Sequence, residues 1–193
     1  MARPREFEID EALEMAMHVF WSKGYEATTL PDLLDAMGIS RGSFYKAFHD
    51  KRSVYFAALE RYEETRVGVT VGNLTDSSNG RGRDRIADLF TRLAAADGRD
   101  GCFLCNAAID RAPHDPEVEA RVNDMIRRLE GGFRHALQED RPALSPDVLQ
   151  STTRSLVVSY FGLQVLGTAG LDNNIARDCL TQVLRMLDEV IGK

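Results

Sequence analysis

Hydrophobic residues recur at intervals of three and four along most of the chain, which is the spacing of amphipathic helices. The first such stretch predicts a helix from about Phe7 to Lys23, ended by Gly24. Its apolar stripe is formed by Ile9, Leu13, Ala16, Met17 and Phe20. No segment shows the alternation of apolar and polar residues that marks a half-buried strand. The pattern therefore predicts an all-α fold.

Two short helices are predicted next, and residues that favour helix ends mark their limits. Thr29 caps the first helix, Pro31 is tolerated in its first turn, and Gly38 ends it. Ser40 caps the second helix, and Asp50 begins a longer helix after it. Two short helices joined across a tight turn are typical of a helix-turn-helix, here at about residues 29–48.

Downstream of Asp50 the same spacing predicts a series of longer helices. The first weakens at the glycine-rich stretch 68–72 and gives way to a loop over 73–82. The others are expected over 83–96, closed by Asp97-Gly98, and over 101–109, 116–139, 145–169 and 173–191. The stretch 101–109 is apolar nearly all round, which predicts burial on most sides. The Gly131-Gly132 pair interrupts the 116–139 helix and favours a bend or a close neighbour.

Composition and charge place the chain among globular proteins. It has 193 residues, 44% of them hydrophobic, and a formal net charge of −6. Its apolar runs are far shorter than the ~20 residues of a membrane span, and its charged N-terminus lacks the apolar core of a signal peptide. We therefore expect a cytoplasmic protein without a membrane partner. Within the negative total, the stretch Ser40–Arg52 carries four cations and one anion, which suits binding to phosphates.

The N-terminal part of the sequence resembles the DNA-binding domain of the TetR family of transcriptional regulators. The resemblance rests on Thr28-Thr29, the turn Ala36–Ser40, Gly42–Tyr45, Phe48 and Lys51. It implies a three-helix helix-turn-helix domain over residues 1–50 and a larger helical domain for effector binding and dimerisation over 51–193. The expected protein is not an enzyme but a repressor that binds a palindromic operator in double-stranded DNA as a homodimer. A small molecule is expected to release it.

The residue types in the second short helix suit contact with DNA. Arg41 and Lys46 can donate hydrogen bonds to guanine edges or to phosphates. Ser43 can reach a base edge or a phosphate, and Gly42 lets the helix lie close to the groove. Phe44 suits either core packing or contact with a thymine methyl group.

The family resemblance adds residues that hold phosphates. It assigns this role to Tyr45 and Lys51, and to Thr28 and Thr29 at the first short helix. Lys51 stands at the start of the long helix, where the helix dipole also favours an anion. The complete predicted DNA-binding set is Thr28, Thr29, Arg41, Gly42, Ser43, Phe44, Tyr45, Lys46, His49 and Lys51.

Apolar and aromatic residues on the later helices predict an effector pocket. Its expected lining is Tyr62, Leu89, Phe90, Leu93, Phe103, Asn106, Ile109, Phe133, Tyr160 and Gln164. Because these side chains carry no charge, we expect a small apolar or aromatic effector with one polar group met by Tyr160, Gln164 or Asn106. Asp110 and Arg111 fit either an ion pair in the pocket or the solvated end of a helix.

Three cysteines are present, and two of them, Cys102 and Cys105, form a single C-x-x-C pair. Zinc needs four ligands and no second pair exists, so no metal site is expected. The pair fits either small buried apolar residues or a thiol sensor, in which the start of a helix would favour a thiolate at Cys102. A regulator switched by its thiols is therefore an alternative function.

The last two predicted helices carry more apolar surface than one neighbouring helix covers. The family resemblance implies that they form a four-helix bundle with the same pair from a second subunit, across a closed two-fold interface. The predicted interface residues are Gly162, Leu163, Leu166, Leu180, Val183, Leu184 and Leu187.

An enzyme or carrier that uses an apolar cavity between helices is the alternative from another class. The sequence contains no nucleophile elbow, Walker loop, G-x-G-x-x-G turn or H-E-x-x-H helix, and it indicates no cofactor. DNA binding upstream of the protein's own gene separates this alternative from a regulator.

Overall fold

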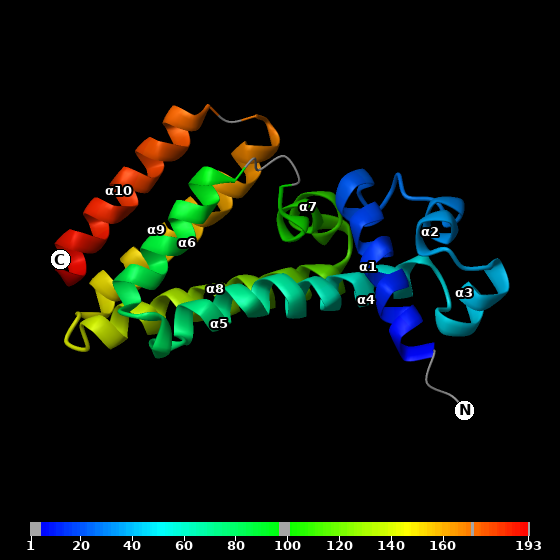
Figure 1. Cartoon of the computed structure of the whole chain (residues 1–193), viewed down its shortest axis with the longest axis horizontal. Coiled ribbons are helices and arrows are strands. Elements are labelled where there is room, and N and C mark those ends of the chain that lie inside the picture. Colours follow the sequence, from blue (N-terminus) through cyan, green and yellow to red (C-terminus); the bar gives the residue numbers. More distant parts are fainter. Residues whose placement is uncertain (1–4, 97–100, 171, 193) are drawn as a thin grey trace. The chain divides into compact units, whose positions relative to one another are not determined.

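The computed structural model describes residues 5–96, 101–170 and 172–192, and within these ranges all regular structure is helical (Figure 1). The predicted all-α fold is confirmed. The α-helices are α1 (Arg5–Lys23), α2 (Leu30–Met37), α3 (Arg41–Ala47), α4 (Lys51–Tyr62), α5 (Gly68–Thr75), α6 (Gly82–Ala95), α7 (Phe103–Asp110), α8 (Pro116–Asp140), α9 (Pro146–Thr168) and α10 (Asn173–Ile191). A π-helical segment, Glu63–Val67, joins α4 to α5, and short 3₁₀ turns lie at Ser77–Asn79 and Ala112–His114. None of the helices in these ranges has the length and apolar character needed to cross a membrane.

The chain divides into two compact units. The first unit comprises Met1–Thr65 and Asn106–Val122, and the second comprises Arg66–Cys105 and Asn123–Lys193. The chain passes from one unit to the other within the π-helical segment, within α7 and within α8. The division of roles at residue 50 concerns function and stays a prediction.

In the first unit, α1 packs against both α2 and α4. The rings of Phe20, Phe44 and Tyr55 are almost fully buried in this unit, together with the Leu33 and Leu59 side chains. Phe20 and Tyr55 meet edge to face with ring centres 5.1 Å apart, a favoured arrangement of aromatic pairs. This core holds the two short helices α2 and α3.

The predicted caps of the helix-turn-helix are confirmed. Thr29 forms a capping box with Asp32 at the start of α2, and Gly38 ends that helix in the left-handed region at φ 65°. The Ser40 side chain caps α3, and the Asp50 carboxylate caps α4. These local bonds fix where α3 begins and ends.

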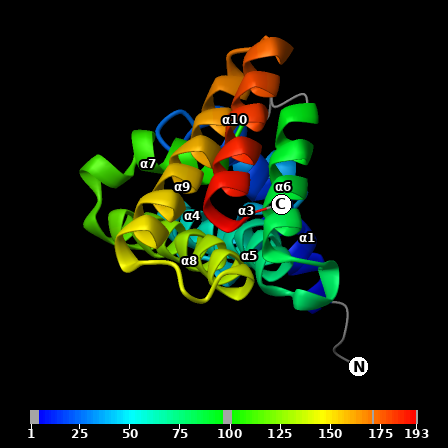
Figure 2. The same ribbon diagram turned by 90° about the vertical axis from the view of Figure 1, so that its left-hand side faces the viewer.

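In the second unit, α6, α9 and α10 lie side by side, as the two views in Figures 1 and 2 show. Phe90 of α6, Phe133 of α8 and Tyr160 of α9 are buried among them. The ring centres of Phe90 and Phe133 are 6.1 Å apart, and those of Phe133 and Tyr160 are 6.3 Å apart. An aromatic cluster therefore forms the centre of this unit.

The predicted loop over 73–82 begins too early, because α5 continues through Gly72 to Thr75. Leu74 is almost fully buried, and the Thr75 hydroxyl donates to the Val71 carbonyl oxygen at 3.0 Å. Residues 73–75 have a composition that favours a loop, but burial of Leu74 keeps them in the helix. The expected closure of the next helix at Asp97-Gly98 lies outside the described residues.

The predicted interruption of the 116–139 helix is wrong, because α8 runs unbroken from Pro116 to Asp140. The expectation of a close neighbour is confirmed at Gly132. A β-carbon there would lie 3.2 Å from Leu74 Cδ1 and 3.6 Å from Val71 Cα. Gly131 has nothing within 4 Å of the same position, so only the second glycine serves packing.

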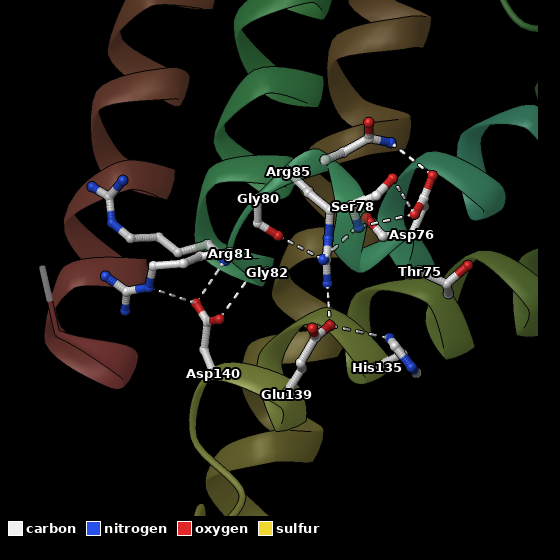
Figure 3. A network of polar contacts seen from close by, with 12 residues as sticks. Thr75, Asp76, Ser78, Gly80, Arg81, Gly82, Arg85, His135, Glu139 and Asp140 are labelled. Carbon is white, nitrogen blue, oxygen red and sulfur yellow. Dashed lines mark hydrogen bonds and ion pairs between the residues drawn. The ribbon is translucent and has the colours of Figure 1, made fainter.

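A buried arginine ties the loop after α5 to the end of α8 (Figure 3). The Arg85 side chain is only 2% exposed and forms an ion pair with Glu139. Its Nη1 also donates to the carbonyl oxygens of Gly80 at 2.7 Å and Asp76 at 3.2 Å. The hydrogen bond from Arg85 holds the pKa of the Glu139 carboxyl below its usual value. This contact fixes the entry into α6.

Candidate nucleic-acid interface

Helix α3 presents most of its side chains to solvent. Its exposed residues are Arg41, Gly42, Ser43, Tyr45, Lys46 and Ala47. Tyr45 is 52% exposed although its ring is large. The outward surface therefore combines two cations with two hydroxyl groups, which are the donors that contact phosphates and base edges in DNA.

Phe44 is the exception on α3, and its predicted role as a DNA contact is wrong. The side chain is fully buried. Its ring lies 5.4 Å from that of Tyr45 and 5.8 Å from that of Phe48, measured between ring centres. The structure shows Phe44 packed in the core, which is the alternative role that the sequence allowed.

The two threonines before α2 differ in what they offer to DNA. Thr28 is 1% exposed, and its hydroxyl donates to the Gly24 carbonyl oxygen at 2.6 Å. The prediction that this side chain holds a phosphate is therefore wrong. Thr29 is exposed, and its hydroxyl lies 2.7 Å from the Asp32 carboxylate within the capping box. A phosphate contact from Thr29 stays a prediction.

Lys51, at the start of α4, is held in place within the first unit. Its Nζ donates to the Thr28 carbonyl oxygen at 2.7 Å and lies 4.3 Å from the centre of the Tyr25 ring. The Lys51 side chain remains partly exposed, and His49 just before α4 is exposed. Contacts from both residues to DNA stay predictions.

Most of the predicted effector residues are buried side chains. Leu89, Phe90, Phe103, Phe133 and Tyr160 are buried in the second unit, while Leu93 and Gln164 are half-buried there. The Gln164 amide donates to the Tyr160 hydroxyl oxygen at 3.2 Å. Burial raises the pKa of Tyr160 to about 12, so the phenol stays neutral near neutral pH. Tyr62 is buried in the first unit.

Two of the predicted effector residues point elsewhere. Ile109 is 70% exposed, so the expected burial of 101–109 on most sides holds for its first part only. The Asn106 amide donates to the Trp21 carbonyl oxygen at 3.0 Å within the first unit. That contact directs the amide toward α1 in the first unit, apart from the aromatic cluster of the second unit, and a role for Asn106 in an effector pocket stays a prediction.

The two paired cysteines are buried. Their mutual hydrogen bond and burial raise the pKa of Cys105 far above its usual value. Helix α7 begins after Cys102, at Phe103. A thiol sensor needs an accessible thiolate, so these features favour the reading as small buried apolar residues. Among the described residues, no three His, Cys, Asp or Glu side chains are grouped to hold a metal ion.

The predicted dimer residues on α9 and α10 differ in how deeply they are buried within the single chain. Leu163, Val183 and Leu187 are buried within the single chain, so these three are wrong as exposed interface residues. Gly162, Leu180 and Leu184 are half-buried, and Leu166 is 47% exposed.

Sequence reasoning missed a second apolar stripe on α9. Val158 and Val165 are 72% and 40% exposed, and Phe161 between them is half-buried. The spacing of the three residues places them on one side of the helix, away from Leu156 and Tyr160. That spacing is the signal by which the sequence alone reveals them. Ile175 on α10 is also 52% exposed.

A polar cluster around Tyr25 was also missed. Asp110 accepts a hydrogen bond from the Tyr25 backbone N–H at 2.7 Å, and the Arg111 guanidinium lies 4.7 Å from the Tyr25 ring centre. Both readings left open for Asp110 and Arg111, a pocket ion pair or a solvated helix end, are therefore wrong. No sequence signal links positions 85 residues apart.

A capped helix-turn-helix with an exposed cationic second helix, joined to a larger helical unit, defines a DNA-binding regulator. Comparison with known proteins agrees. Residues 12–58 match the family described as bacterial regulatory proteins, tetR family. The chain therefore belongs to the TetR family of transcriptional regulators, which are not enzymes.

Three similar proteins extend the match beyond the N-terminal region. YezE, an uncharacterized HTH-type transcriptional regulator from Bacillus subtilis (strain 168), is 29% identical over 196 residues, covering 97% of this chain and 100% of YezE. The HTH-type transcriptional repressor ComR of Escherichia coli (strain K12) is 30% identical over 141 residues, 71% of this chain and 62% of ComR. A cysteine variant of CifR, solved with 26-bp double-stranded operator DNA, is 26% identical with a TM-score of 0.73, covering 95% of this chain and 98% of CifR.

Proposed function

We propose that the protein is a repressor that binds a palindromic operator as a homodimer, with one α3 helix in each of two successive major grooves. The observation that carries this proposal is the arrangement of α3, which exposes Arg41, Ser43, Tyr45 and Lys46 and buries Phe44. A helix presented in this way is the geometry of a recognition helix. The similar protein ComR is named as a repressor, which supports repression rather than activation. We also propose that it acts in the cytoplasm, where the DNA of a bacterium lies.

The exposed apolar stripe of α9 supports a homodimer. Val158, Phe161 and Val165 face away from the core of their own chain, and the neighbouring Leu166 is 47% exposed. Burial of such a stripe against its own copy is the commonest closed arrangement of identical subunits. Two-fold symmetry also explains a palindromic operator, because each subunit reads one half-site.

The aromatic cluster of the second unit supports a small apolar or aromatic effector. Phe90, Phe133 and Tyr160 supply apolar faces, and the Tyr160 hydroxyl with the Gln164 amide supplies one polar point. An effector that binds one conformation of the dimer more tightly shifts the population toward it. If that conformation no longer spaces the two α3 helices by one helical turn of DNA, ~34–36 Å, the operator is released.

Loss of the two cationic contacts should have different effects on DNA binding. Lys51→Ala should weaken binding to all sequences alike and lower the slope of log affinity against log salt by about one unit, because a phosphate contact carries no sequence information. Arg41→Ala should relax the preference at one base position of each half-site. Titrations of operator and scrambled duplexes at several salt concentrations measure both effects. An unchanged salt slope for Lys51→Ala would exclude its phosphate contact.

Replacing Tyr160 by Phe should change which effectors act. The variant keeps the aromatic face but loses the hydroxyl group, so purely apolar ligands should still release DNA while ligands with one hydrogen-bonding group lose potency by roughly tenfold. A panel of paired aromatic compounds, with and without a hydroxyl group, measures release from labelled operator. Cys105→Ser serves as a buried control. If no compound releases wild-type protein, the effector proposal is wrong.

A further inference from the structure

The Lys51 ammonium group is restrained by contacts that come from outside the helix-turn-helix. Its Nζ donates to the Thr28 carbonyl oxygen at 2.7 Å and lies 4.3 Å from the centre of the Tyr25 ring, close enough for a cation–π interaction. A second backbone oxygen, that of Glu26, is 3.5 Å away. An ammonium group has three donors, and the backbone oxygens of Thr28 and Glu26 take two of them, which leaves one donor for a phosphate.

Tyr25 is itself held by residues of α4 and of the end of α7. The Tyr55 ring meets it edge to face at 4.8 Å between ring centres. From the end of α7, the Asp110 carboxylate accepts from the Tyr25 backbone N–H at 2.7 Å, and the Arg111 guanidinium lies 4.7 Å from the ring centre. One aromatic ring therefore has both Lys51 and Arg111 as cationic neighbours.

Carboxylates offset the repulsion between these two cations. Arg111 pairs with Glu26 at 3.2 Å and with Asp115 at 3.2 Å. The Asp115 side chain is 7% exposed and also accepts two hydrogen bonds from Arg52, at 3.1 and 3.2 Å. The hydrogen bond from Arg52 holds the pKa of Asp115 below its usual value. Two carboxylates therefore fix the Arg111 guanidinium beside the ring, whereas the contacts of Lys51 are with backbone oxygens and the ring face.

We propose that Tyr25, Asp110 and Arg111 are positioning residues that hold the Lys51 ammonium group ready for a DNA phosphate. The inference rests on the proposed function, in which Lys51 contacts the DNA backbone. A lysine whose rotamers are already restricted loses less conformational freedom when it meets the phosphate, so binding is stronger. All of these residues belong to the first unit, although Asp110 and Arg111 are 85 positions or more from their partners in the N-terminal region.

A double-mutant cycle on DNA affinity tests this coupling. The variants are Lys51→Ala, Arg111→Gln and the two combined, each titrated with operator and scrambled duplex at several salt concentrations. Arg111→Gln should weaken binding to both duplexes by roughly threefold to tenfold, because Lys51 is less well placed. Lys51→Ala should weaken it by roughly tenfold, and the double variant should be no weaker than Lys51→Ala alone.

Matched variants separate positioning from general loss of structure. Arg121 also belongs to the first unit and pairs with Glu63 at 3.8 Å, so Arg121→Gln removes a comparable charge and should leave DNA affinity unchanged. Tyr25→Phe keeps the ring and should retain wild-type affinity, while Tyr25→Leu should resemble Arg111→Gln. Thermal unfolding of each variant reports on folding independently.

The outcomes distinguish this inference from the proposed function. Suppose that Lys51→Ala weakens binding and that the loss of affinity in the double variant equals the product of the two single losses. The two residues then act independently, so the positioning role is wrong while the phosphate contact stands. If Lys51→Ala binds as tightly as wild type, the phosphate contact in the proposed function is wrong and the positioning role falls with it. Equal losses from Arg121→Gln and Arg111→Gln would also contradict positioning.

Discussion

Val158→Glu is expected to convert the protein into monomers that no longer bind operator DNA. Val158 is 72% exposed in the single chain, so the glutamate should not disturb the fold of a monomer. In a dimer that buries the α9 stripe, the same carboxylate is desolvated and unpaired, which costs about 3–5 kcal/mol and weakens association roughly 100-fold or more. A monomer can hold only one half-site.

Sedimentation at micromolar concentration and operator titration measure the two consequences. Val69→Glu provides a matched control, because Val69 is an apolar residue of α5 that is 56% exposed and lies outside the stripe. It should remain a dimer with wild-type affinity. A dimeric Val158→Glu protein that binds operator normally would place the interface on another surface.

Gly82→Ala should strongly destabilise the second unit. A β-carbon at Gly82 would lie 1.9 Å from the Ala136 carbonyl oxygen and 2.6 Å from the carbonyl carbon, within the backbone of α8. The glycine cannot move away freely, because its backbone N–H donates to the Asp140 carboxylate at 2.9 Å (Figure 3). We expect a loss of about 3 kcal/mol or more in the free energy of unfolding.

Gly131→Ala is the control for this prediction. Gly131 lies within α8, is exposed and has nothing within 4 Å of a β-carbon, so alanine should stabilise the helix by roughly 0.5–1 kcal/mol. Urea unfolding followed by circular dichroism compares the two variants with wild type. Equal midpoints for Gly82→Ala and wild type would contradict the close approach of α6 and α8.

Features that depend on neighbouring residues were predictable from the sequence. The caps at Thr29, Ser40 and Asp50 and the left-handed turn at Gly38 each involve bonds within a few positions, so residue type alone marks them. They fix both short helices of the motif. Which face of α3 meets solvent depends on packing, which buries Phe44 and leaves Arg41 and Lys46 exposed.

Features that depend on distant residues were not predictable. Thr28 is a plausible phosphate ligand by type, but its hydroxyl is buried against the Gly24 carbonyl oxygen. Val183 and Leu187 lie on a wide apolar face of α10, and only the packing of α6 against α10 shows that they point inward. The contact of Arg111 with Tyr25 joins segments that nothing in the sequence pattern pairs.

The proposed function requires two copies of this chain to read an inverted repeat with paired α3 helices. Selection of bound duplexes from a random pool, followed by sequencing, tests it most directly. We expect one enriched inverted repeat with half-site centres one helical turn apart, about 34–36 Å. The same pool selected with Arg41→Ala should lose the preference at one base of each half-site. Enrichment of no sequence, or of a single unsymmetric site, would contradict a dimeric operator-binding regulator.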